Sequence, residues 1–292
     1  MLTCFLLVGM TIATTACGGE EPTPAPAPAP ADTDPAPAPA PEDPADTDPA
    51  PGATAQVFVC GVTEYEPMNY RDSGEWTGFD TEFALLVGER LGLEIEFQMI
   101  DWAQKFTELN AGTIDAIWNG FTATALEPDG TPRMTLADMS YSYMLNTQCV
   151  IVKVERLDEF KSEADLEGKI LAAEAGSAGD SEASDLVGET GSVIGVAQQI
   201  NTFLEVMTGA ADGAVIDFIL ADQLAGTGDF EDVAIAFNLA DEAFAIGFRI
   251  GDPMRDKINA VIKELYDEGA LMELAVKYGV EARLHIDTSF GQ

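Results

Sequence analysis

The residue with the clearest chemical use is Asp217, which ends the apolar segment Ala214–Ile216. A carboxylate at the carboxyl end of a strand lies where α/β folds bind ligands, although the same aspartate could cap a following helix. His285 is the single histidine, which excludes a multi-histidine metal site and disfavours a Ser-His-Asp triad. Cys60 and Cys149 lack metal-ligand spacing and form either a disulfide or two buried thiols. We expect a ligand site with no metal and no cofactor.

The composition narrows the class of partner. The chain has 292 residues, with 51 acidic and 14 basic side chains and a net charge of −37. Nucleic-acid binders need Lys and Arg to displace counterions, so nucleic acid is excluded as a partner, and a polybasic membrane patch is excluded likewise. Twelve of the 16 prolines and eight acidic residues fall in 18–56. Residues 57–292 still carry a charge of about −29, but they hold enough apolar residues for a packed fold.

Strand and helix patterns alternate from Val57 onward. Expected strands are Val57–Gly61, Leu93–Ile100, Thr113–Trp118, Lys169–Ala173, Ala214–Asp217 and Ala243–Arg249. Expected helices are Thr81–Leu91, Trp102–Asn110, one after Gly176-Ser177, Thr202–Thr208, one capped by Asp252 with Pro253 in its first turn, and a shorter one from Gly269 to about Tyr278. The alternation predicts two α/β units whose helices cover the sheets.

The first 56 residues are predicted to be an export signal and a tether. Residues 1–16 form an apolar stretch that ends in small residues, as a signal peptide does, and it is too short to span a bilayer. Thr14-Thr15-Ala16-Cys17 resembles a bacterial lipobox, which implies cleavage before Cys17 and a lipid on its sulfur; a plain cleaved signal is the alternative. Residues 17–56 are the predicted linker, in which proline alternates with alanine from Pro22 to Pro51; this pattern favours an extended acidic segment.

Short motifs then follow in a fixed order along the chain. They are Gly61–Tyr70, Gly78–Asp80, Gly112–Thr122, Ala175–Ser177, Asp212–Asp217 and Gly251–Pro253. Together they resemble the bacterial extracellular solute-binding proteins, family 3, which bind polar amino acids. The resemblance implies a periplasmic-binding-protein type II fold, with two α/β lobes joined by two hinge strands. It also implies that lobe 1 comprises 57–147 plus 246–292 and that lobe 2 comprises 152–240.

The resemblance implies a site that pairs both charges of a free amino acid, because burying an unpaired ion is costly. A ligand carboxylate needs an arginine fork and N–H groups at a helix start, and a ligand ammonium needs a carboxylate. The implied residues are Arg133, Gly176, Ser177 and Ala178 for the carboxylate, Asp217 for the ammonium, and Gly120 and Thr122 for both. Arg133 takes this place only if 127–132 is an inserted loop; otherwise it is a surface arginine. Ser177 could instead serve only as a helix N-cap.

The resemblance also suggests how the ligand side chain is recognised. Tyr65 matches the family's stacking aromatic residue, and stacking suits a planar side chain. Trp102 forms the opposite wall or packs in the core, and Asn119 is expected to reach the ligand. Glu64 meets a cationic side chain or, because its loop is one residue shorter than usual, faces solvent.

These features imply an extracytoplasmic, lipid-anchored binding subunit of an ABC importer. We expect a monomer that captures a free polar amino acid and delivers it to the permease, is held at the cell membrane by its lipid alone, and catalyses no reaction. The expected ligands are basic or neutral polar amino acids and cystine. The alternatives are a ligand-presenting sensor module and a cyclohexadienyl-dehydratase-like enzyme. The enzyme would need a poised acid, for which Glu64 or Glu174 is available, but the sequence offers no second catalytic partner.

Overall fold

The structure, a computed structural model, describes residues 55–291. The predicted signal peptide (1–16), the predicted lipidation site Cys17 and all but the last two residues of the predicted linker (17–56) lie outside the described residues. No helix within 55–291 is long and apolar enough to cross a membrane. The structure therefore bears on the predicted fold and ligand site, and the lipid anchor stays a prediction.

The first lobe is built on a five-stranded sheet in the order β4-β1-β5-β12-β6. Its strands are β1 (Gln56–Val62), β4 (Leu93–Met99), β5 (Ala116–Ile117), β6 (Asp138–Met139) and β12 (Gly247–Phe248). β1 runs parallel to both β4 and β5. The carboxyl ends of β1 and β5 therefore meet at one edge, where the chain continues into Thr63–Tyr65 and Trp118–Thr122.

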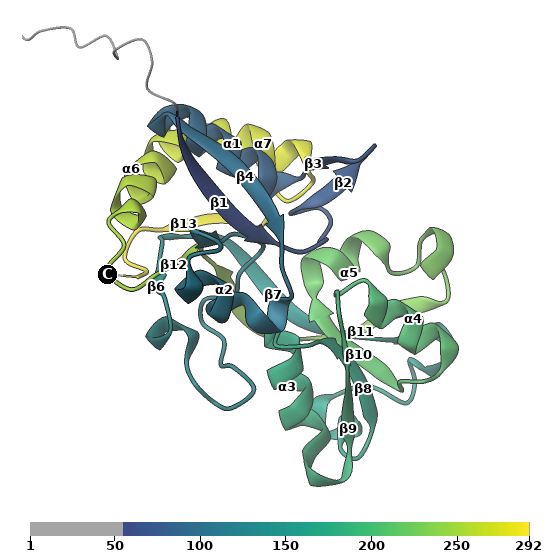
Figure 1. The fold of residues 1–292 in the computed structure, drawn as a ribbon. Helices are drawn as coiled ribbons and strands as arrows, with labels where there is room; N and C mark the ends of the chain where they lie inside the picture. The colour runs from purple at the N-terminus through teal and green to yellow at the C-terminus, as the bar shows by residue number, and fades with distance from the viewer. Residues whose placement is uncertain (1–54, 292) are drawn as a thin grey trace, which may run out of the picture. The chain divides into compact units, whose positions relative to one another are not determined.

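Helices from both ends of the described chain cover this sheet. They are α1 (Phe79–Leu91), α2 (Lys105–Ala111), α6 (Met254–Asp267) and α7 (Ala270–Lys277). Phe83 and Val87 of α1 share one hydrophobic core with Ile262 of α6 and Leu271 of α7, and Figure 1 shows these helices grouped beside β1 and β4. The C-terminal part of the chain thus returns to the lobe in which the described residues begin.

The second lobe is built on the sheet β11-β7-β10-β8-β9, to which β13 adds by pairing with β7. Its elements are β7 (Ser142–Lys153), β8 (Ile170–Glu174), β9 (Ser192–Val196), β10 (Gly213–Asp217) and β11 (Val233–Phe244), with α3 (Ala178–Val187), α4 (Asn201–Thr208) and α5 (Phe218–Leu224). β13 (Leu284–Asp287) pairs with Ser142 and Met144 at the start of β7, and its side chains pack against the core of the first lobe. β8 runs parallel to both β10 and β9. Glu174 and Asp217, the last residues of β8 and β10, therefore lie at the same edge of this sheet.

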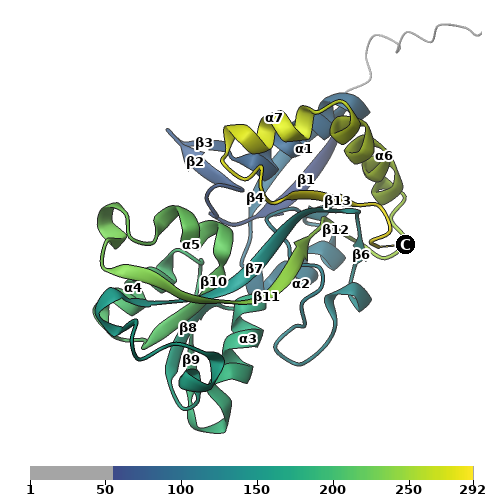
Figure 2. The ribbon, with the colours of Figure 1, turned by 180° about the vertical axis from the view of Figure 1, so that it is seen from behind.

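Two long strands join the lobes. β7 and β11 pair antiparallel, from Met144 opposite Phe244 to Lys153 opposite Val233. Figure 2 shows both strands running from one lobe into the other. This arrangement confirms the predicted two-lobed α/β fold with two hinge strands.

Three predicted elements differ from the structure. The strand expected at Thr113–Trp118 is only β5, and the helix expected from Trp102 opens with a 3₁₀ turn capped by Asp101. The strand expected at Ala243–Arg249 is divided between β11 and β12. It is interrupted because the Ala245 N–H donates to the carbonyl of Phe121 and the Ile246 N–H to the Ser140 hydroxyl. These bonds carry the chain from the hinge into the first sheet.

The sequence patterns did not predict β9, β13, α5 or a small hairpin, and they did not decide whether the two cysteines form a disulfide. The hairpin consists of β2 (Tyr70–Asp72) and β3 (Glu75–Thr77). Cys60 in β1 and Cys149 in β7 are both free thiols in the part of the chain that the structure describes, and both are buried. Burial raises the pKa of each thiol well above its ordinary value, which keeps both thiols unreactive.

Candidate functional site

A small cavity lies between the two lobes, at the edges where the predicted site residues gather. Its volume is about 10 Å³, which one water molecule would fill. The residues that line it are Trp102, Asn119, Gly120, Thr122, Arg133, Gln148, Glu174, Ser177, Ala178, Gln199 and Asp217. Eight of them are among the predicted site residues, and Gln148, Glu174 and Gln199 are not. An amino acid is far larger than this cavity, so the lobes must separate to admit one.

Arg133 is buried at this cavity and is held by three contacts. Its Nε donates to Glu127 Oε1 at 2.7 Å, its Nη1 to the carbonyl of Thr122 at 3.0 Å, and its Nη2 across the cleft to the carbonyl of Gly176 at 3.0 Å. A guanidinium has five N–H groups, so two remain for a ligand. Arg133 therefore lies where the resemblance implied and is not a surface arginine.

Lys105 is a second buried cation beside Arg133, which the sequence patterns did not reveal. Its Nζ donates to Glu127 Oε2 at 2.9 Å and to the carbonyl of Gly176 at 2.8 Å. Burial and the charge of Arg133 lower the pKa of Lys105 to about 8, against the opposing effect of Glu127. Glu127, from the predicted inserted loop, thus acts as the shared counter-ion of both cations.

The turn before α3 forms the second lobe's side of the cavity. Ser177 is the N-cap of α3, since its hydroxyl accepts from the Asp180 N–H at 3.0 Å. The N–H groups of Gly176 and Ser177 already donate to the Asp180 carboxylate and the Glu174 carbonyl. Ala178 occupies the first helical position, where no intrahelical acceptor exists. The Ala178 N–H is therefore the best-placed backbone donor for a ligand anion.

Asp217 is buried at the end of β10 and is held by three side-chain amides. Its carboxylate accepts from Asn146, from Gln148 at 2.7 Å and from Gln199, whose side-chain oxygen accepts in turn from the Asp217 N–H at 3.0 Å. Burial raises the pKa of Asp217, and these amide donors oppose the shift. An anion held by neutral donors keeps its charge available for a ligand cation.

Two further carboxyl groups lie beside Asp217. Glu242 of β11 accepts from Gln148 at 2.9 Å and from the Thr122 hydroxyl at 3.2 Å. Glu174 of β8 is 2% exposed, and among residues 55–291 its Oε1 has no hydrogen-bond partner. Burial, with the charge of Asp217, raises the pKa of each to about 8. The site is therefore rich in carboxyl groups whose charge burial disfavours.

The aromatic candidates and Asn119 lie close by. Tyr65 is buried against Gly120, and the Asp217 charge adds to burial in raising the pKa of its hydroxyl. Trp102 lines the cavity and also packs edge-on against Phe121, so it is both a wall and a core residue. The Asn119 amide is occupied by Thr63, whose N–H and hydroxyl donate to its oxygen.

Glu64 lies apart from the other predicted residues. Its side chain is 35% exposed and its Oε1 is 3.7 Å from Arg71 Nε. It does not line the cavity. Of the two alternatives given for Glu64, this position agrees with the one in which it faces solvent.

The sequence suggested Glu174 only as a catalytic acid for the alternative enzyme, and it did not suggest Lys105, Gln148 or Gln199. Glu174 ends a strand just before Gly176-Ser177, so the strand-end rule that selected Asp217 applies to it equally. Lys105 lies on α2, three residues after the predicted site residue Trp102 and within the helix expected at Trp102–Asn110. Gln148 and Gln199 carry no such signal, because their proximity to Asp217 follows from strand pairing and from the loop before α4.

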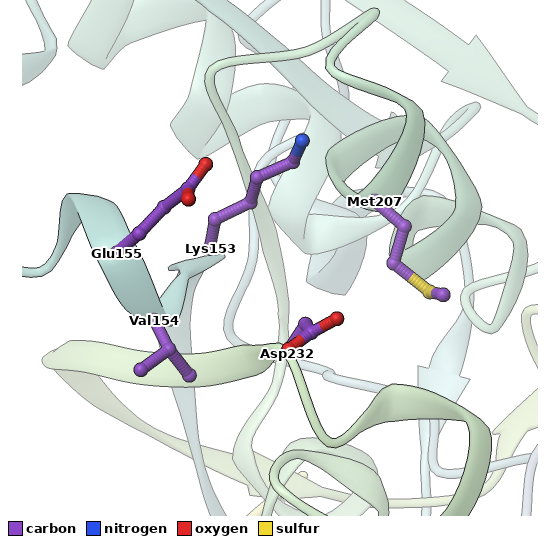
Figure 3. A pocket seen from close by; sticks show the side chains of 5 residues that line it. All are labelled: Lys153, Val154, Glu155, Met207 and Asp232. Atoms are coloured by element: carbon purple, nitrogen blue, oxygen red, sulfur yellow. The ribbon is translucent and has the colours of Figure 1, made fainter.

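A different hollow lies in the second lobe, away from the hinge. It has a volume of about 410 Å³ and is lined by Lys153, Val154, Glu155, Met207 and Asp232. Figure 3 shows Lys153 and Glu155 on one side of it and Met207 on the other. None of the unpartnered buried polar atoms found in residues 55–291 belongs to these five side chains. The same part of the chain holds no cluster of His, Cys, Asp or Glu suited to a metal ion. The cavity between the lobes is therefore the candidate site.

The sequence profile of the bacterial extracellular solute-binding proteins, family 3, matches residues 57–281. The chain belongs to this family. Solute-binding proteins similar to it include the arginine-binding extracellular protein ArtP of Bacillus subtilis, 28% identical over 218 residues, which cover 74% of this chain and 82% of ArtP. The L-cystine-binding protein TcyA of the same organism is 28% identical over 218 residues, with 73% and 77% covered.

Solved structures of solute-binding proteins show the same fold. An ABC uptake transporter substrate-binding protein from Streptococcus pneumoniae, with bound histidine, is 31% identical to this chain. It superposes with a TM-score of 0.67 over 76% of this chain and 92% of that protein. The family match and these relatives establish an extracellular amino-acid-binding protein of the ABC-transporter type.

Proposed function

We propose that this chain is the substrate-binding subunit of an ABC importer and binds a free polar amino acid between its two lobes. The observation that carries the proposal is the pair Arg133 and Asp217. They come from opposite lobes, both are buried, and both line one cavity. A buried cation and a buried anion on facing walls complement the carboxylate and ammonium of an amino acid. The relatives named for binding arginine and cystine support this class of ligand.

Each ligand group then has a defined set of partners. The carboxylate takes the two remaining N–H groups of Arg133 and the N–H of Ala178. The ammonium donates to Asp217, to the Gly120 carbonyl and to the Thr122 hydroxyl. Tyr65 and Trp102 enclose the side chain.

Binding proceeds by closure about the hinge strands β7 and β11. Lobe 1 (57–147 plus 246–292) receives the ligand, and lobe 2 (152–240) closes over it with Ser177, Ala178 and Asp217. The closed form then docks on the permease. Lipid on Cys17 holds the protein at the outer face of the cell membrane, and the chain acts by binding alone, without catalysis.

A thermal-shift screen of the purified protein against the twenty amino acids, cystine and ornithine tests this proposal. A ligand that binds only the folded state raises the melting temperature by mass action. We expect at least one polar amino acid to do so, and Asp217→Asn to remove the shift. Asp229→Asn, an exposed aspartate of the second lobe, is the matched control and should keep it. No shift with any of these compounds would refute the proposal.

A further inference from the structure

Glu174 is a buried carboxyl group that the amino-acid site, as proposed so far, does not use. It ends β8, lines the cavity and is 2% exposed. Within residues 55–291 its Oε1 receives no hydrogen bond, whereas the neighbouring Asp217 receives three from amides. A buried carboxyl oxygen without a hydrogen-bond partner is costly. A ligand that brings a donor to Oε1 would remove this cost.

Two other unpartnered side-chain atoms beside Asp217, Gln148 Oε1 and Asn146 Oδ1, are acceptors, and the unpartnered Tyr65 hydroxyl can both donate and accept. Both amides are oriented by the carboxylates, since each NH₂ group donates to Asp217 and to Glu242. The amide oxygens must therefore point the other way. Most of the unpartnered atoms here, the oxygens of Glu174, Gln148 and Asn146, can accept, so they suit a ligand rich in N–H groups.

The charges near Glu174 favour a cation as well. Lys105 and Arg133 face it with positive charge, and Asp217 and Asp101 with negative charge. Both cations already pair with Glu127, at 2.9 Å and 2.7 Å, and both donate to the Gly176 carbonyl. Four carboxyl groups, those of Glu127, Glu174, Asp217 and Glu242, thus stand against two cations. A neutral amino acid brings no charge to these carboxyl groups, whereas a cationic side chain stabilises the charged form that burial disfavours.

We propose that the amino acid bound here has a cationic side chain and that Glu174 selects it by accepting a hydrogen bond from its guanidinium or ammonium group. The inference rests on the proposed function, because it names the class of amino acid taken by the same site. Guanidinium and ammonium groups carry only donors, whereas a neutral amide adds an acceptor that the unpartnered amide oxygens of Gln148 and Asn146 cannot satisfy. Glu64, the residue that the sequence suggested for this role, pairs with Arg71 at the surface instead.

Equilibrium binding of L-arginine and L-citrulline to the purified protein tests the inference. The two compounds have side chains of nearly the same shape, but the ureido group of citrulline is neutral. A hydrogen bond to a charged partner corresponds to roughly a 10- to 100-fold change in affinity, so arginine should bind tighter by that factor. Glu174→Gln should remove this preference by weakening arginine alone. Glu189→Gln, an exposed glutamate of the same lobe, should leave both affinities unchanged.

A second variant allows the test to be made even if Glu174→Gln does not fold. Glu174→Leu removes both oxygens and should likewise abolish the preference for arginine, with the melting temperature of each variant reporting that it is folded. Equal affinity for arginine and citrulline in the wild-type protein would overturn the inference and leave the proposed function standing. A preference that survives both substitutions would overturn the role of Glu174. Failure of every amino acid to bind would overturn the proposed function itself.

Discussion

The two walls of the cleft carry opposite charges and are held in different ways. The first lobe brings Arg133 and Lys105, whose charges are fixed by Glu127 and by backbone carbonyls. The second lobe brings Asp217, held by neutral amides, and Glu174, whose Oε1 has no partner within the described chain. The cationic wall is therefore organised before any ligand arrives. The acidic wall has unsatisfied atoms, and so it is the wall on which ligand identity has the larger effect.

Removing the charge of Arg133 from the first wall should have the largest effect on ligand affinity. Arg133→Met leaves Glu127 with Lys105 alone and leaves a ligand carboxylate without its fork. Truncating one partner of a buried, hydrogen-bonded charge pair between protein and ligand costs about 2–5 kcal/mol of binding free energy, so affinity should fall by at least about 30-fold. Isothermal titration with the ligand found in the screen measures this. Arg71→Met, at a half-exposed surface pair, is the control and should bind normally; a loss equal to that of Arg133→Met would argue against the site.

The next largest expected effect is that of pH on the free energy of unfolding, through the buried carboxyl groups of Glu174 and Glu242. The pKa values of Glu174 and Glu242 are raised to about 8 in the fold, whereas an unfolded glutamate titrates near its ordinary value of about 4.3. Between these values the folded state holds more protons than the unfolded state. The free energy of unfolding should therefore fall as the pH rises from 5 to 8, by up to about 1.4 kcal/mol per pH unit for each group.

Urea denaturation of the ligand-free protein at several pH values measures this slope. The double variant Glu174→Gln, Glu242→Gln should make the slope less steep, because neither amide titrates; burial also raises the pKa of Asp80 and Glu182 to about 7, so part of the slope should remain. Stability that rises from pH 5 to pH 8 would contradict the picture of an acidic wall that burial keeps protonated.

The smallest expected effect comes from the contact between the walls. Gly176 has φ +72°, and a Cβ there would lie 2.9 Å from Ala103 Cα in the first lobe. Gly176→Ala should hinder closure and weaken ligand binding by roughly tenfold, in addition to the ~1 kcal/mol cost of a side chain at positive φ. Gly209→Ala, with φ +76° but with only the Lys153 Nζ nearby at 3.7 Å, carries the same backbone cost. Titration and thermal melting of both variants separate the effects: the control should lose stability and keep its affinity.

The sequence predicted those parts of the molecule that follow from local pattern or from ordered motifs. The amphipathic helices, the carboxylate at the strand end and the two-lobed fold are of this kind. The alternation of elements indicated two units, but the hinge strands followed only from the family resemblance. β7 and β11 pair residues about 100 positions apart, such as Met144 and Phe244, and such pairing leaves no local trace.

The missed site residues have a related explanation. Lys105 sits on a short helix, where a lysine is usually solvated, and its burial depends on Glu127, 22 residues later in an inserted loop. Glu174 is a carboxylate at the end of a strand, as Asp217 is. The ligand contacts were nevertheless assigned to Gly176 and Ser177, because they begin the helix that follows. Contacts between residues far apart in the sequence, rather than residue type, thus determine which polar groups lie in the cleft.

The carbonyl of Gly176 accepts from both Lys105 and Arg133 across the cleft. These two bonds join atoms of opposite lobes, so they exist only while the lobes are together. These bonds therefore stabilise the closed protein relative to the open protein. They change the fraction of ligand-free molecules that is closed, and the measured affinity depends on that fraction. The chain can therefore become a tighter or a weaker receptor through Lys105 and the loop that carries Glu127, without any change in the atoms that the amino acid touches.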